Sequence, residues 1–295
     1  STVMHQNDPT IKVFGPEISQ FYGLGSGPTD ATGKFWMEDF LKGISEYERQ
    51  HPTLGFHLLD GVSFHRYQFS DARQASALLL SSTSEWDYTL PPLRQLIRQD
   101  FGRDLPIAIT EVNTNPGSTV PSRQFATVWW ADTLGRLMNS QVEYAAFFSA
   151  EGVNTPYPLF TMNSPRSIGG LQETPMLRVM QLFTHLQSNV VPVQVQREPV
   201  SVYVTQDDTH STVSLLFINK SGSSQLAQVS SESGFLPIHP WPELQIQLSA
   251  YGIAVVTLHR DGGAEAYSYV TPRSGQMTPA LAHLVCGNAG NILDD

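Results

Sequence analysis

Hydrophobic and polar positions follow different periods in the two parts of the chain. Through residue 187, short apolar runs alternate with stretches in which apolar residues recur every three or four positions. Short apolar runs are typical of buried strands, and the longer spacing is typical of helices with one buried face. Strands separated by helices pair in parallel through right-handed crossovers. The pattern therefore predicts an α/β fold with a parallel sheet in this part.

The apolar runs predict four strands and the longer spacing predicts four helices. The strands are expected at Ile11 to Phe14, Gly61 to Tyr67, Leu105 to Thr110 and Glu143 to Phe148. Helical spacing starts at Trp36, runs from Ala72 to Phe101 with a break at Pro91 and Pro92, and returns over Pro121 to Ser140 and Met176 to Leu186. Because Trp36, Trp129 and Trp130 share this helical spacing, we expect all three to pack in the core.

The hydrophobic pattern changes after Gln187, where apolar and polar residues alternate and helical spacing is absent. Val200, Val202 and Val204 alternate with polar or aromatic neighbours, and a second alternating run includes Leu244 to Leu248. Short alternating strands are typical of antiparallel sheets with one buried face. We therefore expect a first domain over residues 1–187 and a β-sandwich over 188–270. The tail over 271–295 has a weak pattern and is left unassigned.

Composition narrows the classes of partner. The chain has 295 residues and a net charge of −10, which disfavours nucleic acids and anionic membranes because both need basic faces. Its single cysteine, Cys286, excludes an internal disulfide and a cysteine-based metal site. No His-Glu-x-x-His or Gly-x-Ser-x-Gly motif occurs, so zinc and serine hydrolases are disfavoured, and no cofactor is expected. The pattern Asn219-Lys220-Ser221 is an acceptor sequence for N-glycosylation.

Polar groups follow each of the four expected strands. The carboxyl ends of parallel strands meet at one edge of the sheet, where α/β enzymes collect their reacting groups. Taken alone, His65 is more typical of a core histidine whose hydrogen bonds are satisfied. The strand period of two, however, puts it on one face with Tyr67. Four successive polar strand ends predict a site at this edge. Its candidate residues are Glu17, His65, Tyr67, Glu111, Asn113, Phe148 and Glu151.

Glu111 is the strongest candidate for chemistry. It ends an apolar run with β-branched residues, and turn-forming residues follow Asn113. A buried strand has no structural need for a carboxylate at its carboxyl end, although capping of the next helix is an alternative. Glu111 is therefore the residue expected to react or to bind.

Three segments resemble a known group of enzymes. Thr10 to Pro16, Asp60 to Tyr67 and Pro106 to Asn113 are similar to the fifth, sixth and seventh strands of retaining (β/α)8 glycoside hydrolases. These belong to the large clan that carries its two catalytic glutamates on strands four and seven. The resemblance implies a TIM barrel followed by a β-sandwich, a β-linked carbohydrate substrate and Glu111 as nucleophile. It also implies that Tyr67 hydrogen-bonds the nucleophile or its leaving group and that His65 lines the sugar subsite.

The chain departs from that group in one respect. The acid/base glutamate of the clan follows an asparagine, and no Asn-Glu pair occurs here. About four strand–helix units precede the expected sandwich, so the resemblance implies the second half of a barrel. The missing half is then a separate chain, a truncated part or a second copy, or the acid is Glu17 or Glu151. A non-catalytic carbohydrate-binding or scaffold protein is the alternative function.

Overall fold

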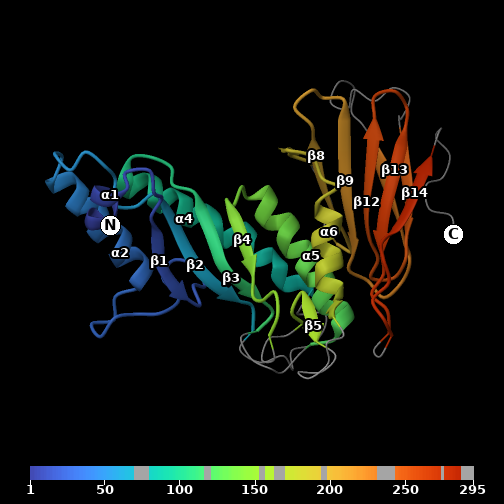
Figure 1. Ribbon diagram of the computed structural model, residues 1–295, viewed down its shortest axis with the longest axis horizontal. Coiled ribbons are helices and arrows are strands. Elements are labelled where there is room, and N and C mark those ends of the chain that lie inside the picture. Colours follow the sequence, from blue (N-terminus) through green and yellow to red (C-terminus); the bar gives the residue numbers. More distant parts are fainter. Residues whose placement is uncertain are drawn as a thin grey trace.

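A computed structural model shows a four-stranded parallel sheet in the first part of the chain. The structure describes residues 1–69, 80–115, 121–152, 157–162, 170–193, 198–230, 243–273 and 276–286. The strands pair in the order β1-β2-β3-β4, as expected for consecutive strand–helix units (Figure 1). Their bounds are β1 Phe14–Ser19, β2 Gly61–Tyr67, β3 Ile107–Asn113 and β4 Tyr144–Phe147.

Helices alternate with these strands. They are α1 Thr2–Asn7, α2 Trp36–Gln50, the 3-10 helix η1 Ser82–Glu85, α4 Trp86–Phe101, α5 Arg123–Asn139 and α6 Pro175–Phe183. Val62 and Phe64 of β2 are fully buried and share one apolar cluster with Leu90 of α4 and Val128 of α5. In the described part of the chain, none of the helices combines the length and apolarity that a bilayer crossing requires.

The parallel sheet is strongly curved. Phe14 of β1 and Tyr144 of β4 have ring centroids 5.9 Å apart, although they belong to the first and last strands. Four strands in a flat sheet would place the outer two about 14 Å apart. The ring of Phe14 also occupies the space in which a Cβ on Gly61 of β2 would stand. Because strand side chains project roughly perpendicular to the sheet, both rings lie on its concave face.

The second part of the chain is antiparallel. A six-stranded sheet has the order β14-β13-β12-β9-β8-β7, and β10 pairs with β11 separately. A short hairpin, β5 Phe160–Met162 with β6 Leu171–Glu173, precedes α6. The other bounds are β7 Asn189–Val191, β8 Val200–Gln206, β9 Thr212–Asn219, β10 Gln225–Ser230, β11 Glu243–Leu248, β12 Ile253–His259, β13 Ala264–Tyr269 and β14 Ala282–Cys286.

The six-stranded sheet is buried on both faces. On β9, Leu215 and Phe217 join a cluster with Ile246 of β11, whereas Leu216 and Ile218 belong to the cluster that contains the helices. Helices α5 and α6 lie between the parallel sheet and this antiparallel sheet (Figure 1). Because successive side chains of β9 point to opposite faces and both faces are apolar, this strand packs against the helices on one side and against β11 on the other.

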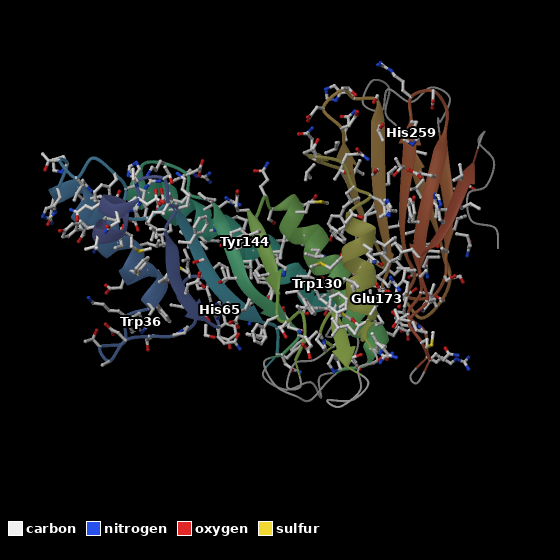
Figure 2. The ribbon with its side chains drawn as sticks, viewed as in Figure 1. Trp36, His65, Trp130, Tyr144, Glu173 and His259 are labelled. Carbon is white, nitrogen blue, oxygen red and sulfur yellow. The ribbon has the colours of Figure 1, made fainter. Side chains whose placement is uncertain are left out.

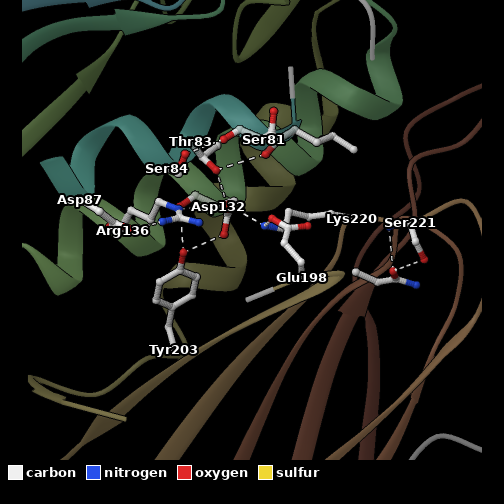
Figure 3. A network of polar contacts seen from close by, with 12 residues as sticks. Ser81, Thr83, Ser84, Asp87, Asp132, Arg136, Glu198, Tyr203, Lys220 and Ser221 are labelled. Carbon is white, nitrogen blue, oxygen red and sulfur yellow. Dashed lines mark hydrogen bonds and ion pairs between the residues drawn. The ribbon is translucent and has the colours of Figure 1, made fainter. Parts of the chain in front are cut away.

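A buried polar network also joins the two parts (Figure 3). Asp132 of α5 is fully buried and accepts hydrogen bonds from Thr83 (2.5 Å) and from the phenol of Tyr203 on β8 (2.7 Å). It also forms ion pairs with Arg136 at 3.3 Å and with Lys220 at 3.6 Å. Burial opposes ionisation of Asp132, but the charges of Lys220 and Arg136 lower the pKa of this carboxyl.

Two expectations about helices were wrong. Helix α4 continues through Pro91 and Pro92, and both proline rings are exposed, so they face solvent and not the packed core. The first residues of the pattern that was expected to begin at Ala72 lie outside the described residues. Trp36 is 50% exposed and does not pack in the core, because α2 buries Met37 and Leu41. Trp129 and Trp130 are buried, as expected.

Other differences concern strand positions and the glycosylation pattern. The first strand begins at Phe14, where the expected strand ended, because its pairing with Gly61 sets the register. Strand β14 lies in the tail that the sequence left unassigned. The side-chain amide of Asn219 is fully buried and donates to the carbonyls of Ser223 and Ser249, both at 2.8 Å. This asparagine therefore closes a turn inside the antiparallel part.

Candidate active site

Glu111 lies at the carboxyl end of β3 between two polar side chains. Its Oε2 atom accepts a hydrogen bond of 2.5 Å from the phenol of Tyr67 and lies 3.4 Å from Nδ1 of His65. Its side chain is 30% exposed. A carboxylate that is both held by neighbours and accessible can react with a ligand or bind one.

His65 links Glu111 to a second carboxylate. Its Nε2 atom lies 3.0 Å from Oε2 of Glu17 at the end of β1, and Thr110 also donates a hydrogen bond to that oxygen. His65 is near the lower ends of the strands in Figure 2. The polar chain thus crosses three strands at one edge of the sheet, as the sequence predicted for Glu17, His65, Tyr67 and Glu111.

Irregular strand pairing brings these side chains together. Between β1 and β2 the register shifts at Glu17, which has a positive φ of 60°. Between β2 and β3 it shifts at Thr110, because Phe64 pairs with Ile109 and His65 pairs with Glu111. Each bulge adds one residue and redirects its side chain. The two bulge residues, Glu17 and Thr110, contact each other, so both bulges shape this site.

Tyr67 is arranged as a hydrogen-bond donor. Burial raises the pKa of its phenol strongly, and the neighbouring carboxylate of Glu111 raises it further. Its backbone N–H donates to the side-chain oxygen of Gln20 at 3.1 Å. The phenol therefore keeps its proton at neutral pH and donates a hydrogen bond to the carboxylate of Glu111.

Asn113 and Phe148 extend the site towards β4. The buried amide of Asn113 donates to the carbonyl of Phe148 at 2.6 Å, and its own oxygen accepts from the backbone of Thr114. The ring of Phe148 meets that of Tyr67 edge to face at 6.4 Å and is 40% exposed. Asn113 therefore holds the strand end, and Phe148 offers an exposed ring beside the carboxylate.

Glu151 lies apart from this group. It forms an isolated parallel bridge with Phe160 of β5, and its side chain is exposed. Within the described ranges, no hydrogen bond joins its carboxylate to Glu111 or His65. Thr110 and Gln20 were not among the predicted site residues. Thr110 donates a hydrogen bond to Glu17, and Gln20 accepts one from the backbone N–H of Tyr67. The contacts of Thr110 depend on a bulge and those of Gln20 on the loop after β1, and neither feature leaves a pattern in the sequence.

The side chains gathered at this strand edge carry mainly carboxylate and hydroxyl groups, from Glu17, Glu111, Tyr67 and Thr110. No group of three or more histidine, cysteine or acidic side chains among the residues described here is arranged to hold a metal ion. The chemistry available to these residues consists of nucleophilic attack by a carboxylate and hydrogen bonding by a phenol and an imidazole.

No protein-family model and no curated protein sequence matches the chain.

Several solved structures share the fold. A family 44 xyloglucanase from Paenibacillus polymyxa has a TM-score of 0.61 and 13% identity, covering 91% of this chain and 58% of its own. A family 44 endoglucanase from Clostridium thermocellum has a TM-score of 0.57 and 15% identity, covering 90% and 57%.

A family 51 α-L-arabinofuranosidase from Bifidobacterium longum has a TM-score of 0.57 and 13% identity, covering 87% and 60%. This chain thus spans less than two thirds of the length of each of these proteins. At such identities the likeness concerns the fold alone. The chain combines parallel and antiparallel sheets in an α/β fold like that of glycoside hydrolases.

Proposed function

We propose that the chain is the carboxyl-terminal part of a retaining glycoside hydrolase, built as half of a (β/α)8 barrel followed by a β-sandwich. The observation that carries the proposal is the position of Glu111, whose carboxylate is bonded by Tyr67 and faces His65 at the carboxyl end of a parallel strand. The likeness of the fold to glycoside hydrolases supports the same class of reaction.

Glu111 acts as the nucleophile in this proposal. Its carboxylate oxygen forms a bond to the anomeric carbon while the bond from that carbon to the leaving oxygen breaks, and the leaving oxygen keeps the electron pair. Water then attacks the anomeric carbon and releases the carboxylate. The phenol of Tyr67 donates a hydrogen bond to the nucleophile, and His65 orients it.

A second carboxyl group must protonate the leaving oxygen and later take a proton from water. Glu17 is a poor choice for this role, because Thr110 and His65 both face the same oxygen and an imidazole ring separates it from Glu111. We infer that the acid comes from a segment that completes the barrel along β1 and β4, the outer strands of the sheet in the described part of the chain. The chain's coverage of 57–60% of the similar structures leaves room for such a segment.

The substrate is a carbohydrate that approaches the carboxyl edge of the sheet. Phe148 offers an exposed ring on which a sugar can stack, and Asn113 fixes the backbone of that residue. The exposed carboxylate of Glu151 lies further along the rim and can accept hydrogen bonds from sugar hydroxyls. A non-catalytic carbohydrate-binding protein would use the same surface without the covalent step.

A substrate with a very good leaving group tests the nucleophile without the missing acid. A 2,4-dinitrophenyl glycoside needs little protonation, so the chain alone should release one equivalent of dinitrophenolate and retain the sugar as an ester on Glu111. Mass spectrometry of peptides should locate this sugar on the peptide that contains Glu111. Glu111→Gln should abolish the release of dinitrophenolate and the labelling while the far-UV circular dichroism stays unchanged.

Glu143→Gln is the matched control, because Glu143 is exposed and precedes β4 at the opposite end of the sheet. It should label like the parent. Labelling of another residue would discard Glu111 as the nucleophile. Binding of the glycoside without any covalent product, across a panel of sugars, would favour the non-catalytic alternative.

A further inference from the structure

A second cavity lies beyond the candidate active site, where the two parts of the chain meet. Its volume is about 520 Å³, within the range of roughly 300–1,000 Å³ that is usual for small-molecule sites. Strands β5 and β6 supply one wall, and the described residues shortly before β14 supply the other. The two walls include Thr161, Gln172 and Glu173, and then Gln276, Met277 and Thr278.

Backbone pairing connects this cavity to the candidate active site. Phe148 packs against Tyr67, and three residues later Glu151 bridges to Phe160 of β5. Phe160 pairs in turn with Glu173 of β6. Paired strands lie about 4.8 Å apart, so two such steps put the cavity wall about 10 Å beyond Glu151.

The side chains of the cavity suit a neutral ligand rich in hydroxyl groups. Threonine hydroxyls and glutamine amides each donate and accept hydrogen bonds, which matches sugar hydroxyls. Met277, which is 86% exposed, and the exposed Leu171 offer apolar contact for the C–H faces of a ring. The two charges in the wall are engaged elsewhere, since Glu173 pairs with Arg178 and Arg123 lies over the ring of Tyr157.

One buried guanidinium fixes the two walls relative to each other. Arg178 of α6 donates to the carboxylate of Glu173 on the hairpin and to the carbonyl of Pro279 in the β13–β14 connection at 2.7 Å. Its side chain is 9% exposed and that of Glu173 is 43% exposed, so the guanidinium is held within the fold while its carboxylate partner faces the cavity wall. The cavity is therefore formed before any ligand arrives, which lowers the entropic cost of binding.

We propose that this junction cavity binds one unit of an extended neutral glycan, at a distance from the bond that Glu111 attacks. The inference rests on the proposed function and narrows it: the substrate is an oligosaccharide or polysaccharide, and the antiparallel part contributes to its recognition. Gln172 from the hairpin and Gln276 from the β13–β14 connection bond the hydroxyls of this unit from opposite sides.

The test uses the full chain with Glu111→Gln and neutral gluco- and xylo-oligosaccharides of two to six units. Calorimetry should show affinity that rises with length. Gln172→Ala combined with Gln276→Ala should lower the affinity for the longest oligosaccharide about tenfold, the effect of two lost hydrogen bonds, and leave that for the shortest unchanged. Gln245→Ala with Gln247→Ala, two exposed glutamines on β11, is the matched control and should change neither.

The methyl resonance of Met277 in protein labelled at methionine reports on the cavity directly. Long oligosaccharides should shift it, whereas the exposed Met4 on α1 should not respond. Affinity independent of oligosaccharide length, with no shift of the Met277 resonance and no effect of the double variant, would overturn the cavity assignment. Covalent labelling of Glu111 would still support the proposed function in that case. Failure of every glycan to bind or label would overturn both.

Discussion

At the scale of single residues, the sequence could place His65, Tyr67 and Glu111 in one group because strand periodicity and parallel strand ends are local rules. The structure brings the three together around one carboxylate oxygen. Thr110 and Gln20 could not be predicted, since their contacts depend on a bulge and on a loop that no periodicity describes. The roles of Glu111 and its neighbours in catalysis stay predictions.

Asp132 gives a prediction at this scale that concerns stability and pH. Asp132→Asn should lower the free energy of unfolding at pH 7 by about 2 kcal/mol, because Lys220 and Arg136 lose their shared buried partner. They keep Glu198 and Asp87, respectively. Because folding lowers the pKa of Asp132, its contribution is present above the unfolded value of about 3.9 and is lost as pH falls through the lower folded value. Urea unfolding of the parent should therefore show a steeper loss below about pH 4 than that of the variant.

The matched control for this change is Asp104→Asn. Asp104 pairs with Arg98 on the surface, with both side chains more than half exposed. Exposed pairs contribute about 0–1 kcal/mol, so this variant should differ little from the parent at either pH. Equal losses of unfolding free energy in the two variants would contradict the conclusion that the buried network stabilises the fold more than a surface ion pair does.

At the scale of elements, the sequence located β2 at its observed bounds because an apolar run between turns is a strong local signal. The prediction of the buried face of α2 was wrong for Trp36. Trp36 and Met37 are adjacent, and tertiary packing buries Met37 and leaves Trp36 exposed. The continuity of α4 across Pro91 and Pro92 depends on which side of the helix faces water. These choices are made by packing and not by local propensity.

Helix α5 offers a test of close packing between the two parts. A Cβ added at Gly135 would lie 2.3 Å from the ring of Tyr203, which is fully buried. Gly135→Ala should therefore lower the free energy of unfolding by about 1–3 kcal/mol through overpacking. Chemical denaturation of the full chain measures the change.

Gly43→Ala in α2 is the paired control, because a Cβ there would meet nothing within 4 Å. Alanine is favoured over glycine in a helix by about 1 kcal/mol, so this variant should be at least as stable as the parent. If Gly135→Ala were stabilising to the same degree, the contact between α5 and β8 would be looser than the structure has it.

At the scale of the whole molecule, the change from helical to alternating pattern indicated two parts, and the structure has a parallel and an antiparallel sheet. The contact between the parts could not be predicted, because β9 is apolar on both faces and either face could have been the interface. The same holds for β14, whose pairing with β13 is not marked in the pattern of the tail.

Removal of the antiparallel part should therefore damage the rest of the molecule. A chain that ends after Gln187 would expose the buried faces of α5 and α6, including Val179 and Leu182. We expect this fragment to aggregate on size-exclusion chromatography and to lose several degrees of melting temperature in calorimetry, whereas the full chain unfolds in one transition. A soluble monomer with an unchanged melting temperature would show that the two parts are independent.

The buried amide of Asn219 has a consequence for producing the protein in a eukaryotic secretory host. Both N–H donors of that amide are used inside the fold, in a position that leaves no space for an attached oligosaccharide. An oligosaccharyltransferase that modified the acceptor sequence during synthesis would thus produce chains that cannot close this turn. Secreted, correctly folded material should carry an unmodified asparagine at this position, and the occupied fraction should remain in the endoplasmic reticulum.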